Sequence, residues 1–193
     1  GVPAAEITVV QSGTAVDQVA RTARSDPRPA LGLAGGTPLI ITTGALVGHK
    51  DHATLVRAAQ LAARSRPDLH WAIVGEGDRR GALEALIREL ALEGRVHLLG
   101  EVPDAVRLVA AADLFVMSSA MEGLGTSVLD AMALGIPVVG TAAGGIPELL
   151  QGGAGRLVPP REPAALAEAV RSVLENPEAR AAQVARAREA VRR

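Results

Sequence analysis

The stretch that decides the fold is Asp113-Leu-Phe-Val-Met-Ser-Ser-Ala-Met-Glu-Gly-Leu-Gly-Thr-Ser-Val-Leu-Asp-Ala-Met-Ala-Leu-Gly-Ile-Pro-Val-Val-Gly-Thr-Ala-Ala-Gly-Gly-Ile-Pro-Glu148. It begins with a short apolar run over residues 114–117, which is typical of a strand buried on both faces. Gly123 and Gly125 interrupt the chain there and allow the backbone to turn. Apolar residues then recur with helical spacing over 126–134, until a glycine and a proline end the helix before a second strand. A glycine turn and another helix follow, so the stretch predicts alternating strands and helices.

The rest of the chain repeats this alternation. Strands are expected at 38–43, 69–75, 96–100, 114–117, from 138, and at 154–158. Helices are expected at 51–65, 79–93, from the segment 101–104 to about 112, and at 126–134, 163–175 and 177–192. Such alternation predicts an α/β fold with a doubly wound, six-stranded, parallel, Rossmann-like sheet. The expected strand order is 3-2-1-4-5-6, with the ligand crevice between strands 1 and 4.

A length of 193 residues is enough for one domain with a sizeable core. We assign residues 37–193 to this domain and residues 1–36 to a lead-in or interdomain segment that includes a short strand-like run at 7–10. Residues 21–30 are polar and contain prolines, which predicts an exposed connector.

The bulk composition excludes several kinds of partner and site. The net charge of −1 gives no reason to expect nucleic acid or an anionic membrane as a partner. The absence of cysteine rules out disulfides and thiolate metal sites, which is compatible with the cytoplasm. No run is long and apolar enough to span a bilayer, and the start of the chain lacks a signal-peptide pattern. Because Trp71 and Phe115 are the only aromatic residues, ring stacking is not expected to dominate ligand binding.

The turn before the 126–134 helix has the features of a phosphate site. Free N–H groups and the positive end of the helix dipole face the crevice, and both favour an anion. Glu122 stands just before the helix, and Asp130 lies one turn into it. Carboxylates suit hydroxyl groups rather than phosphate, so the combination predicts a sugar nucleotide as the ligand.

A second candidate lies in the turn after the first strand, Gly44-Ala-Leu-Val-Gly-His-Lys50. Lys50 is the single lysine among 20 basic residues, so a phosphate contact is favoured over a merely solvated side chain. Because strands 1 and 4 are expected to be neighbours, Lys50 and Glu122 should meet at one site.

These motifs resemble the donor-binding signature of the large retaining glycosyltransferase family four, whose members have the GT-B fold. The resemblance rests on Glu122-Gly-Leu-Gly, Asp130-Ala-Met-Ala, Gly135-Ile-Pro-Val-Val and Gly144-Gly-Ile-Pro-Glu148, and it covers about residues 36–190. It matches only the C-terminal, donor-binding half of such an enzyme. The partners implied are a nucleotide diphosphate sugar and a missing N-terminal acceptor-binding domain, without which this fragment should be inactive.

The resemblance also implies roles for individual residues. Lys50 and Glu122 would be the catalytic residues, with Lys50 on the diphosphate and Glu122 on the donor sugar hydroxyls. Asp130 would bind the ribose, and backbone groups near Val102 would hold the base. The implied donor-binding set is Gly44, Ala45, Lys50, Gly75, Gly77, Val102, Glu122, Gly123, Leu124, Gly125, Thr126 and Asp130. No metal or other cofactor is expected, since the family binds its donor without metal and the histidines at 49 and 52 should diverge.

Two positions depart from the family pattern. Ala45 occupies the position where the family usually has an arginine on the diphosphate, and Asp130 replaces a glutamate. Arg79 or an arginine of the missing domain could take over the first role. The parent enzyme would move a hexose-type sugar to a hydroxyl acceptor with retention of configuration, in the cytoplasm or at its membrane face through the missing domain.

Three alternatives remain open at this point. A GT-B sugar-nucleotide epimerase would share the fold and the donor, and a non-catalytic sugar-nucleotide-binding module would explain both departures. An NAD-linked enzyme is the weakest, because Gly75-x-Gly77 is not followed by a third glycine at position 80. The turn ending at Lys50 likewise fails the P-loop pattern of a nucleotide triphosphatase.

Overall fold

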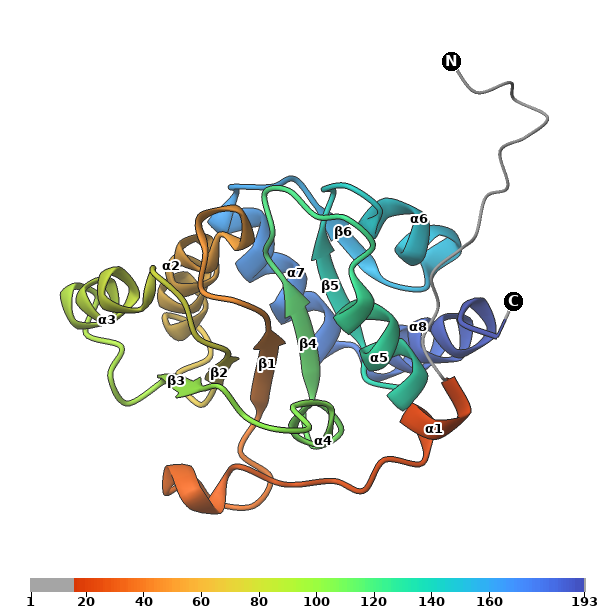
Figure 1. Cartoon of the computed structure of the whole chain (residues 1–193), viewed down its shortest axis with the longest axis horizontal. Helices are drawn as coiled ribbons and strands as arrows, with labels where there is room; N and C mark the ends of the chain where they lie inside the picture. Colours follow the sequence, from red (N-terminus) through yellow and green to blue (C-terminus); the bar gives the residue numbers. More distant parts are fainter. Residues whose placement is uncertain (1–15, 193) are drawn as a thin grey trace.

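The computed structural model describes residues 16–192, so the strand expected at 7–10 lies outside the described residues. A six-stranded sheet with all pairs parallel forms the centre of the molecule (Figure 1). Its order is β3-β2-β1-β4-β5-β6, which confirms the predicted doubly wound arrangement. The strands are β1 (Leu39–Thr43), β2 (His70–Val74), β3 (Val96–Gly100), β4 (Leu114–Met117), β5 (Val138–Thr141) and β6 (Arg156–Val158).

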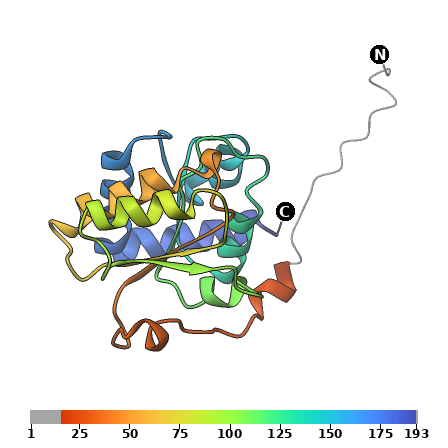
Figure 2. The same cartoon turned by 60° about the vertical axis from the view of Figure 1, so that its left-hand side comes forward.

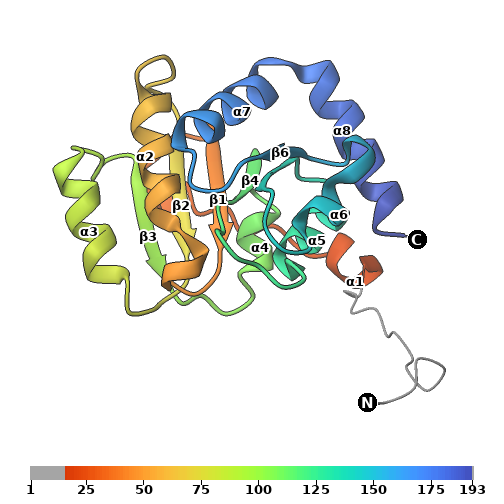
Figure 3. The same ribbon diagram turned by 90° about the horizontal axis from the view of Figure 1, so that it is seen from above.

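Helices cover both faces of the sheet, as Figures 2 and 3 show. One face carries α2 (His52–Ala63), α3 (Arg80–Glu89) and α7 (Pro163–Glu175). The opposite face carries α4 (Val106–Val109), α5 (Thr126–Leu134), α6 (Ile146–Leu150) and α8 (Pro177–Ala190). α1 (Val16–Ala20) packs beside α5.

Strands β1 to β5 each supply residues to two separate cores, because successive side chains point to opposite faces. In β1, Ile40 belongs to the core beneath α2, whereas Leu39 and Ile41 belong to the core beneath α5. Trp71 lies in the first core and Phe115 in the second, and both are fully buried. These rings are therefore unavailable for stacking on a ligand.

Some predicted boundaries were wrong. The helix expected at 79–93 ends at Glu89, and Ala91 takes a φ of 52° just beyond it. The helix expected to reach about residue 112 from the segment 101–104 is only the short α4, because Asp104 has a φ of 53° and turns the chain first. The sixth strand begins at Arg156 rather than at 154.

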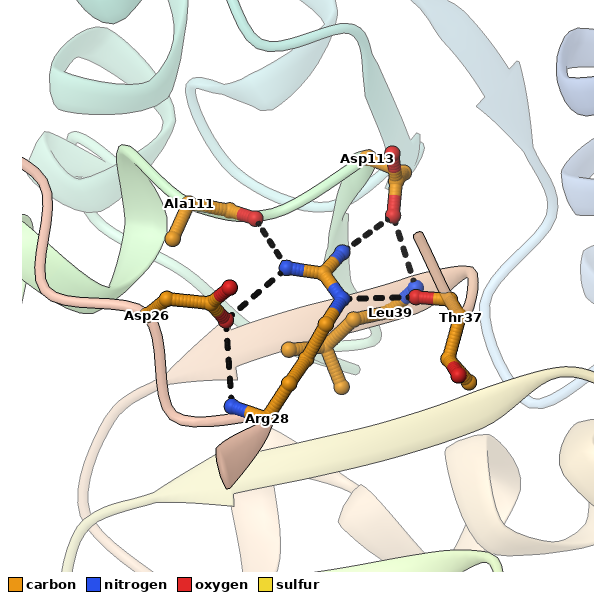
Figure 4. A network of polar contacts seen from close by, with 6 residues as sticks. All are labelled: Asp26, Arg28, Thr37, Leu39, Ala111 and Asp113. Atoms are coloured by element: carbon orange, nitrogen blue, oxygen red, sulfur yellow. Dashed lines mark hydrogen bonds and ion pairs between the residues drawn. The ribbon is translucent and has the colours of Figure 1, made fainter. Parts of the chain in front are cut away.

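The connector at 21–30 is only partly exposed, since Pro27 and Arg28 are buried. The Arg28 guanidinium donates to the carbonyl oxygens of Thr37, at 2.7 Å, and Ala111, at 2.9 Å (Figure 4). It also forms ion pairs with Asp26, at 3.0 Å, and Asp113, at 2.6 Å. This network joins the connector to the amino ends of β1 and β4, so the connector is part of the packed structure.

Candidate functional site

The candidate site lies where the carboxyl ends of β1 and β4 meet. The turn after β1 contains a short 3-10 helix, Gly48–Lys50, and the turn after β4 runs beside it. The two turns are joined through the carbonyl oxygen of His49, which accepts from the amides of Ala120, at 2.8 Å, and Met121, at 3.3 Å. The predicted meeting of these two stretches is therefore confirmed, although they are far apart in the sequence.

Lys50 and Glu122 form an ion pair at this junction. The distance from Lys50 Nζ to Glu122 Oε2 is 2.6 Å, and the two side chains are only 19% and 11% exposed. Oε2 also accepts from the Ser119 hydroxyl at 2.9 Å, while Oε1 accepts from the Gly123 amide at 3.2 Å. The carboxylate is thus held through both of its oxygens.

The environment of Glu122 keeps its carboxyl group ionised. Burial alone raises the pKa of Glu122, because a charge is less stable away from water. The hydrogen bonds from Lys50 and Ser119, the charge of Lys50 and the Gly123 amide outweigh burial and hold the pKa below its usual range. A carboxylate that accepts hydrogen bonds is suited to binding hydroxyl groups.

Three buried hydroxyl groups support the pair, and the sequence reasoning assigned no role to them. Ser118, Ser119 and Thr141 are each at most 1% exposed. Ser118 Oγ donates to the carbonyl oxygen of Lys50 at 3.0 Å, and Thr141 Oγ1 donates to that of Ser119 at 2.6 Å. The sequence did contain a signal for these residues, because two serines directly follow a fully apolar strand. Buried hydroxyl groups need hydrogen-bond partners, so such serines indicate polar contacts at the end of the strand.

Glycines let the turns around the site approach each other closely. A Cβ atom on Gly144 would lie 1.7 Å from the Glu122 carbonyl oxygen, and Gly144 also has a φ of +53°. Cβ atoms on Gly75 and Gly77 would lie 2.0 Å from Gly44 O and 2.4 Å from Leu46 O. Gly75 and Gly77 therefore pack against the turn that carries Lys50, and a direct contact with nucleotide stays a prediction.

Helix α5 begins at this site without a side-chain cap. Its N-cap residue is Gly125, in the left-handed conformation with a φ of 63°. Thr126 and Leu124 are exposed beside it, and Asp130 is partly buried one turn further on. The helix start follows three residues after Glu122, and free amide groups at such a position favour an anion.

The remaining predicted site residues occupy different surroundings. Ala45 is exposed on the turn after β1, and Val102 packs against the core beneath α5. Arg79 lines a cavity of about 290 Å³ between α2 and α3, which neither Lys50 nor Glu122 lines.

The histidines beside Lys50 do not converge. His49 is exposed, whereas His52 is buried and its Nδ1 atom has no hydrogen-bond partner. Burial lowers the pKa of His52 to about 4, with the charge of Lys50 acting in the same direction. Within residues 16–192 there is no group of three acidic or histidine side chains suited to a metal ion. In the same part of the chain, every helix is too short or too polar to cross a bilayer.

Comparisons with known proteins bear on the family and the fold of the chain. A family model described as glycosyl transferases group 1 matches residues 24–190. A Corynebacterium glutamicum protein named GDP-mannose-dependent monoacylated alpha-(1-6)-phosphatidylinositol monomannoside mannosyltransferase is 33% identical over 174 residues. That match covers 86% of this chain and 45% of the relative.

Two further matches are also to glycosyltransferases or to a complex with a nucleotide sugar. The putative colanic acid biosynthesis glycosyltransferase WcaL of Escherichia coli is 34% identical over 178 residues, which are 87% of this chain and 42% of the relative. The crystal structure of Anabaena Alr3699/HepE in complex with UDP-glucose matches with a TM-score of 0.84 and 29% identity, over 99% of this chain and 54% of that one. The chain thus spans about half the length of these proteins.

Proposed function

Because the chain belongs to the group 1 glycosyl transferases and has the fold of the C-terminal half of a GT-B enzyme, we propose that it binds the sugar-nucleotide donor of a glycosyltransferase. The observation that carries the proposal is the Lys50–Glu122 ion pair beside the uncapped start of α5. The pair supports the proposal because a cation and a carboxylate suited to hydroxyl groups lie close to the free amides of the helix start.

The diphosphate of the donor would lie between Lys50 and the start of α5. Lys50 supplies a full positive charge, and the amides of Gly125 and Thr126 supply hydrogen-bond donors at the positive end of the helix dipole. These groups replace a metal ion as the counter-charge, so we propose that donor binding needs no metal. They would also stabilise the negative charge that develops on the diphosphate as the sugar leaves.

The carboxylates would bind the sugars of the donor. Glu122 is ionised and accepts hydrogen bonds, so it suits the hydroxyl groups of the transferred sugar. Asp130 lies one turn along α5, where a ribose next to the diphosphate would come within reach of a carboxylate. Backbone groups near Val102 would hold the base.

The proposed reaction moves a hexose-type sugar to an acceptor hydroxyl with retention at the anomeric carbon. The acceptor would be bound mainly by the other half of a longer protein, because this chain covers about half of each relative described above. The names of these proteins make GDP-mannose and UDP-glucose the first donors to test. We place the reaction in the cytoplasm, with any membrane contact made by the other half.

Two alternatives share the donor site. An epimerase or a non-catalytic binding module would bind the same nucleotide sugar. The non-catalytic module is the alternative suggested by Ala45, which is exposed where the family usually has an arginine. The curated relatives described above are named as transferases, which favours transfer.

Calorimetric titration with GDP-mannose and UDP-glucose in the presence of EDTA tests the proposal. We expect binding of one base series, and a loss of about tenfold or more in affinity for Lys50→Met and for Glu122→Ala, since each removes a charged partner of the ligand. Arg57→Met on α2 and Glu89→Ala on α3 are matched controls, because both residues are exposed on helices and lie outside the two turns. Equal affinities in all four variants would refute the site, and binding that requires a divalent cation would refute the metal-free proposal.

A further inference from the structure

The hydroxyl of Ser119 is committed to the Glu122 carboxylate. Ser119 is 0% exposed, and its Oγ lies 2.9 Å from Glu122 Oε2, the oxygen that also accepts from Lys50. The second neighbour of this hydroxyl is the sulfur of Met117, at 3.2 Å. A thioether is a weak acceptor and a carboxylate a strong one, so the single hydroxyl proton is directed at Glu122.

The backbone that carries this hydroxyl is itself held in place. Thr141 Oγ1, at the end of β5, donates to the carbonyl oxygen of Ser119 at 2.6 Å. Complete burial restricts the rotation of the Ser119 side chain. The hydroxyl is therefore a fixed donor, whereas the Lys50 ammonium stands at the end of a flexible stem.

The proposed function gives this difference a consequence. When Lys50 binds the diphosphate, its charge and hydrogen bond are shared with or lost to the ligand. Glu122 is 11% exposed, so burial then disfavours its ionised form. The hydrogen bonds that remain to it are those from Ser119 Oγ and the Gly123 amide.

We propose that Ser119 is a positioning residue of the donor site, a role that rests on the proposed function. Ser119 holds the Glu122 carboxylate in place for the donor sugar while Lys50 binds the diphosphate. Ser119 acts through Glu122 and does not touch the ligand. Loss of its hydroxyl should therefore affect the part of the donor that Glu122 binds, the sugar, and leave the nucleotide diphosphate bound as before.

Ser118 provides a matched control. It is the adjacent residue, is equally buried at 1% exposed, and also donates a hydrogen bond across to the other turn. Its acceptor is the backbone carbonyl oxygen of Lys50, however, and not a carboxylate. Loss of the Ser118 hydroxyl should displace Lys50, and so weaken the nucleotide diphosphate and the nucleotide sugar alike.

The first measurement needs no ligand. The Glu122 carboxyl carbon is titrated by ¹³C NMR in the wild-type chain and in Ser119→Ala, Ser118→Ala, Lys50→Met and the double variant Lys50→Met/Ser119→Ala. We expect Ser119→Ala to raise the pKa of Glu122 by about one unit, and by more in the Lys50→Met background. Ser118→Ala acts on Glu122 only by shifting Lys50, so it should raise this pKa less than Ser119→Ala does. A Glu122 pKa that is the same with and without the Ser119 hydroxyl would overturn the proposal.

The second measurement compares UDP with UDP-glucose, and GDP with GDP-mannose, by calorimetry. We expect Ser119→Ala to weaken the nucleotide sugar about tenfold while the nucleotide diphosphate binds as in wild type. If Ser119→Ala weakened the nucleotide diphosphate as much as the nucleotide sugar, which is the result predicted for Ser118→Ala, the proposed role of Ser119 would be overturned. Ser119→Cys keeps a weaker donor on a larger sulfur atom, so it should bind the nucleotide sugar more weakly than the wild type does. A Cys variant equal to the wild type would count against the hydrogen bond as the cause.

The two proposals fail in different ways. If the wild-type chain binds neither nucleotide nor nucleotide sugar, the proposed function of this chain fails, and the carboxyl titration still decides whether Ser119 controls Glu122. If the wild type binds and Ser119→Ala binds equally well, the donor site stands and the role of Ser119 fails.

Discussion

At the scale of single residues, the site combines groups whose charges depend on one another. Lys50 forms an ion pair with Glu122 on one side, and its charge also reaches the buried imidazole of His52. Glu122 is kept ionised by its partners, whereas His52 is kept neutral by burial. Changes at these residues should therefore be visible in the dependence of stability and binding on pH.

His52 predicts a loss of stability in mild acid. Its pKa falls from 6.5 to about 4 in the folded chain, so the unfolded chain binds an extra proton between these values. Stability is then fully present above about pH 6.5 and is lost as the pH falls toward 4, by about 3 kcal/mol for this group. Denaturant unfolding at several pH values should show a shallower pH dependence in His52→Leu than in the wild type.

The other histidines limit how this result is interpreted. Burial also lowers the pKa of His70 and His97, whose rings stack, so part of the slope remains in His52→Leu. His70 begins β2, so it lies at the opposite end of the parallel sheet from the turn that carries Lys50. His70→Gln serves as a comparison and should remove a different part of the pH dependence. Identical slopes for the wild type and His52→Leu would contradict the assignment.

Ala45 predicts a gain of function in binding. Ala45 is exposed on the turn that carries Lys50, so an arginine there would have room to reach an anion. Ala45→Arg should tighten UDP or GDP binding about three- to tenfold, because a second cation meets the diphosphate. Ala85→Arg, exposed on α3, controls for added charge. Weaker binding by Ala45→Arg, with the fold preserved, would show that the site is built around the alanine.

At the scale of elements, the site depends on how closely four turns approach one another. The turn after β5 contacts the turn after β4 through Gly144, and the turn after β2 contacts the turn after β1 through Gly75. These contacts are between backbones, so they fix the positions of Lys50 and Glu122 before any ligand binds. A side chain at such a glycine would separate the turns.

Gly144→Ala should therefore lower the free energy of unfolding by about 2–5 kcal/mol and abolish donor binding, since the new Cβ meets a carbonyl oxygen and the φ of +53° is unfavourable for alanine. Gly81→Ala on α3 is the control, because it has open space and no positive φ. It should stabilise the chain by about 0.5 kcal/mol, since alanine favours helix. Urea unfolding measures both, and a Gly144→Ala variant as stable as the wild type would contradict the packing.

Much of the element arrangement could be predicted from the sequence. Apolar runs located the strands, and parallel topology brought Lys50 next to Glu122, because both follow local patterns and general chain-crossing rules. The roles of Ser119 and Arg28 could not be predicted, because their partners are set by tertiary packing. Asp104 and Ala91 shortened two helices through backbone conformations that helical spacing does not reveal.

At the scale of the whole molecule, one end of the sheet carries the candidate site and the other end is held by a polar network. The carboxyl ends of β1 and β4 carry the candidate site, whereas their amino ends are joined to the connector by the Arg28 network in Figure 4. Asp113 accepts from both Arg28 and the amide of Leu39, so one carboxylate ties the connector to two strands.

Arg28→Met should therefore destabilise the chain without changing the site. The loss leaves two carbonyl oxygens with fewer partners, which costs about 2 kcal/mol, whereas Asp113 is 43% exposed and can turn to water. Arg24→Met, exposed on the same connector, should have little effect. Thermal unfolding gives the stability and calorimetry the donor affinity; reduced affinity in folded Arg28→Met would show that the two ends are coupled.

The most direct test of the central claim is a crystal structure of the chain with the tighter-binding nucleotide sugar of the calorimetric series. We expect Lys50 to leave Glu122 for the diphosphate, the start of α5 to contact a phosphate, and Glu122 to bind the sugar hydroxyls while it still accepts from Ser119. A nucleotide sugar bound in the cavity between α2 and α3, with the Lys50–Glu122 pair intact, would contradict it.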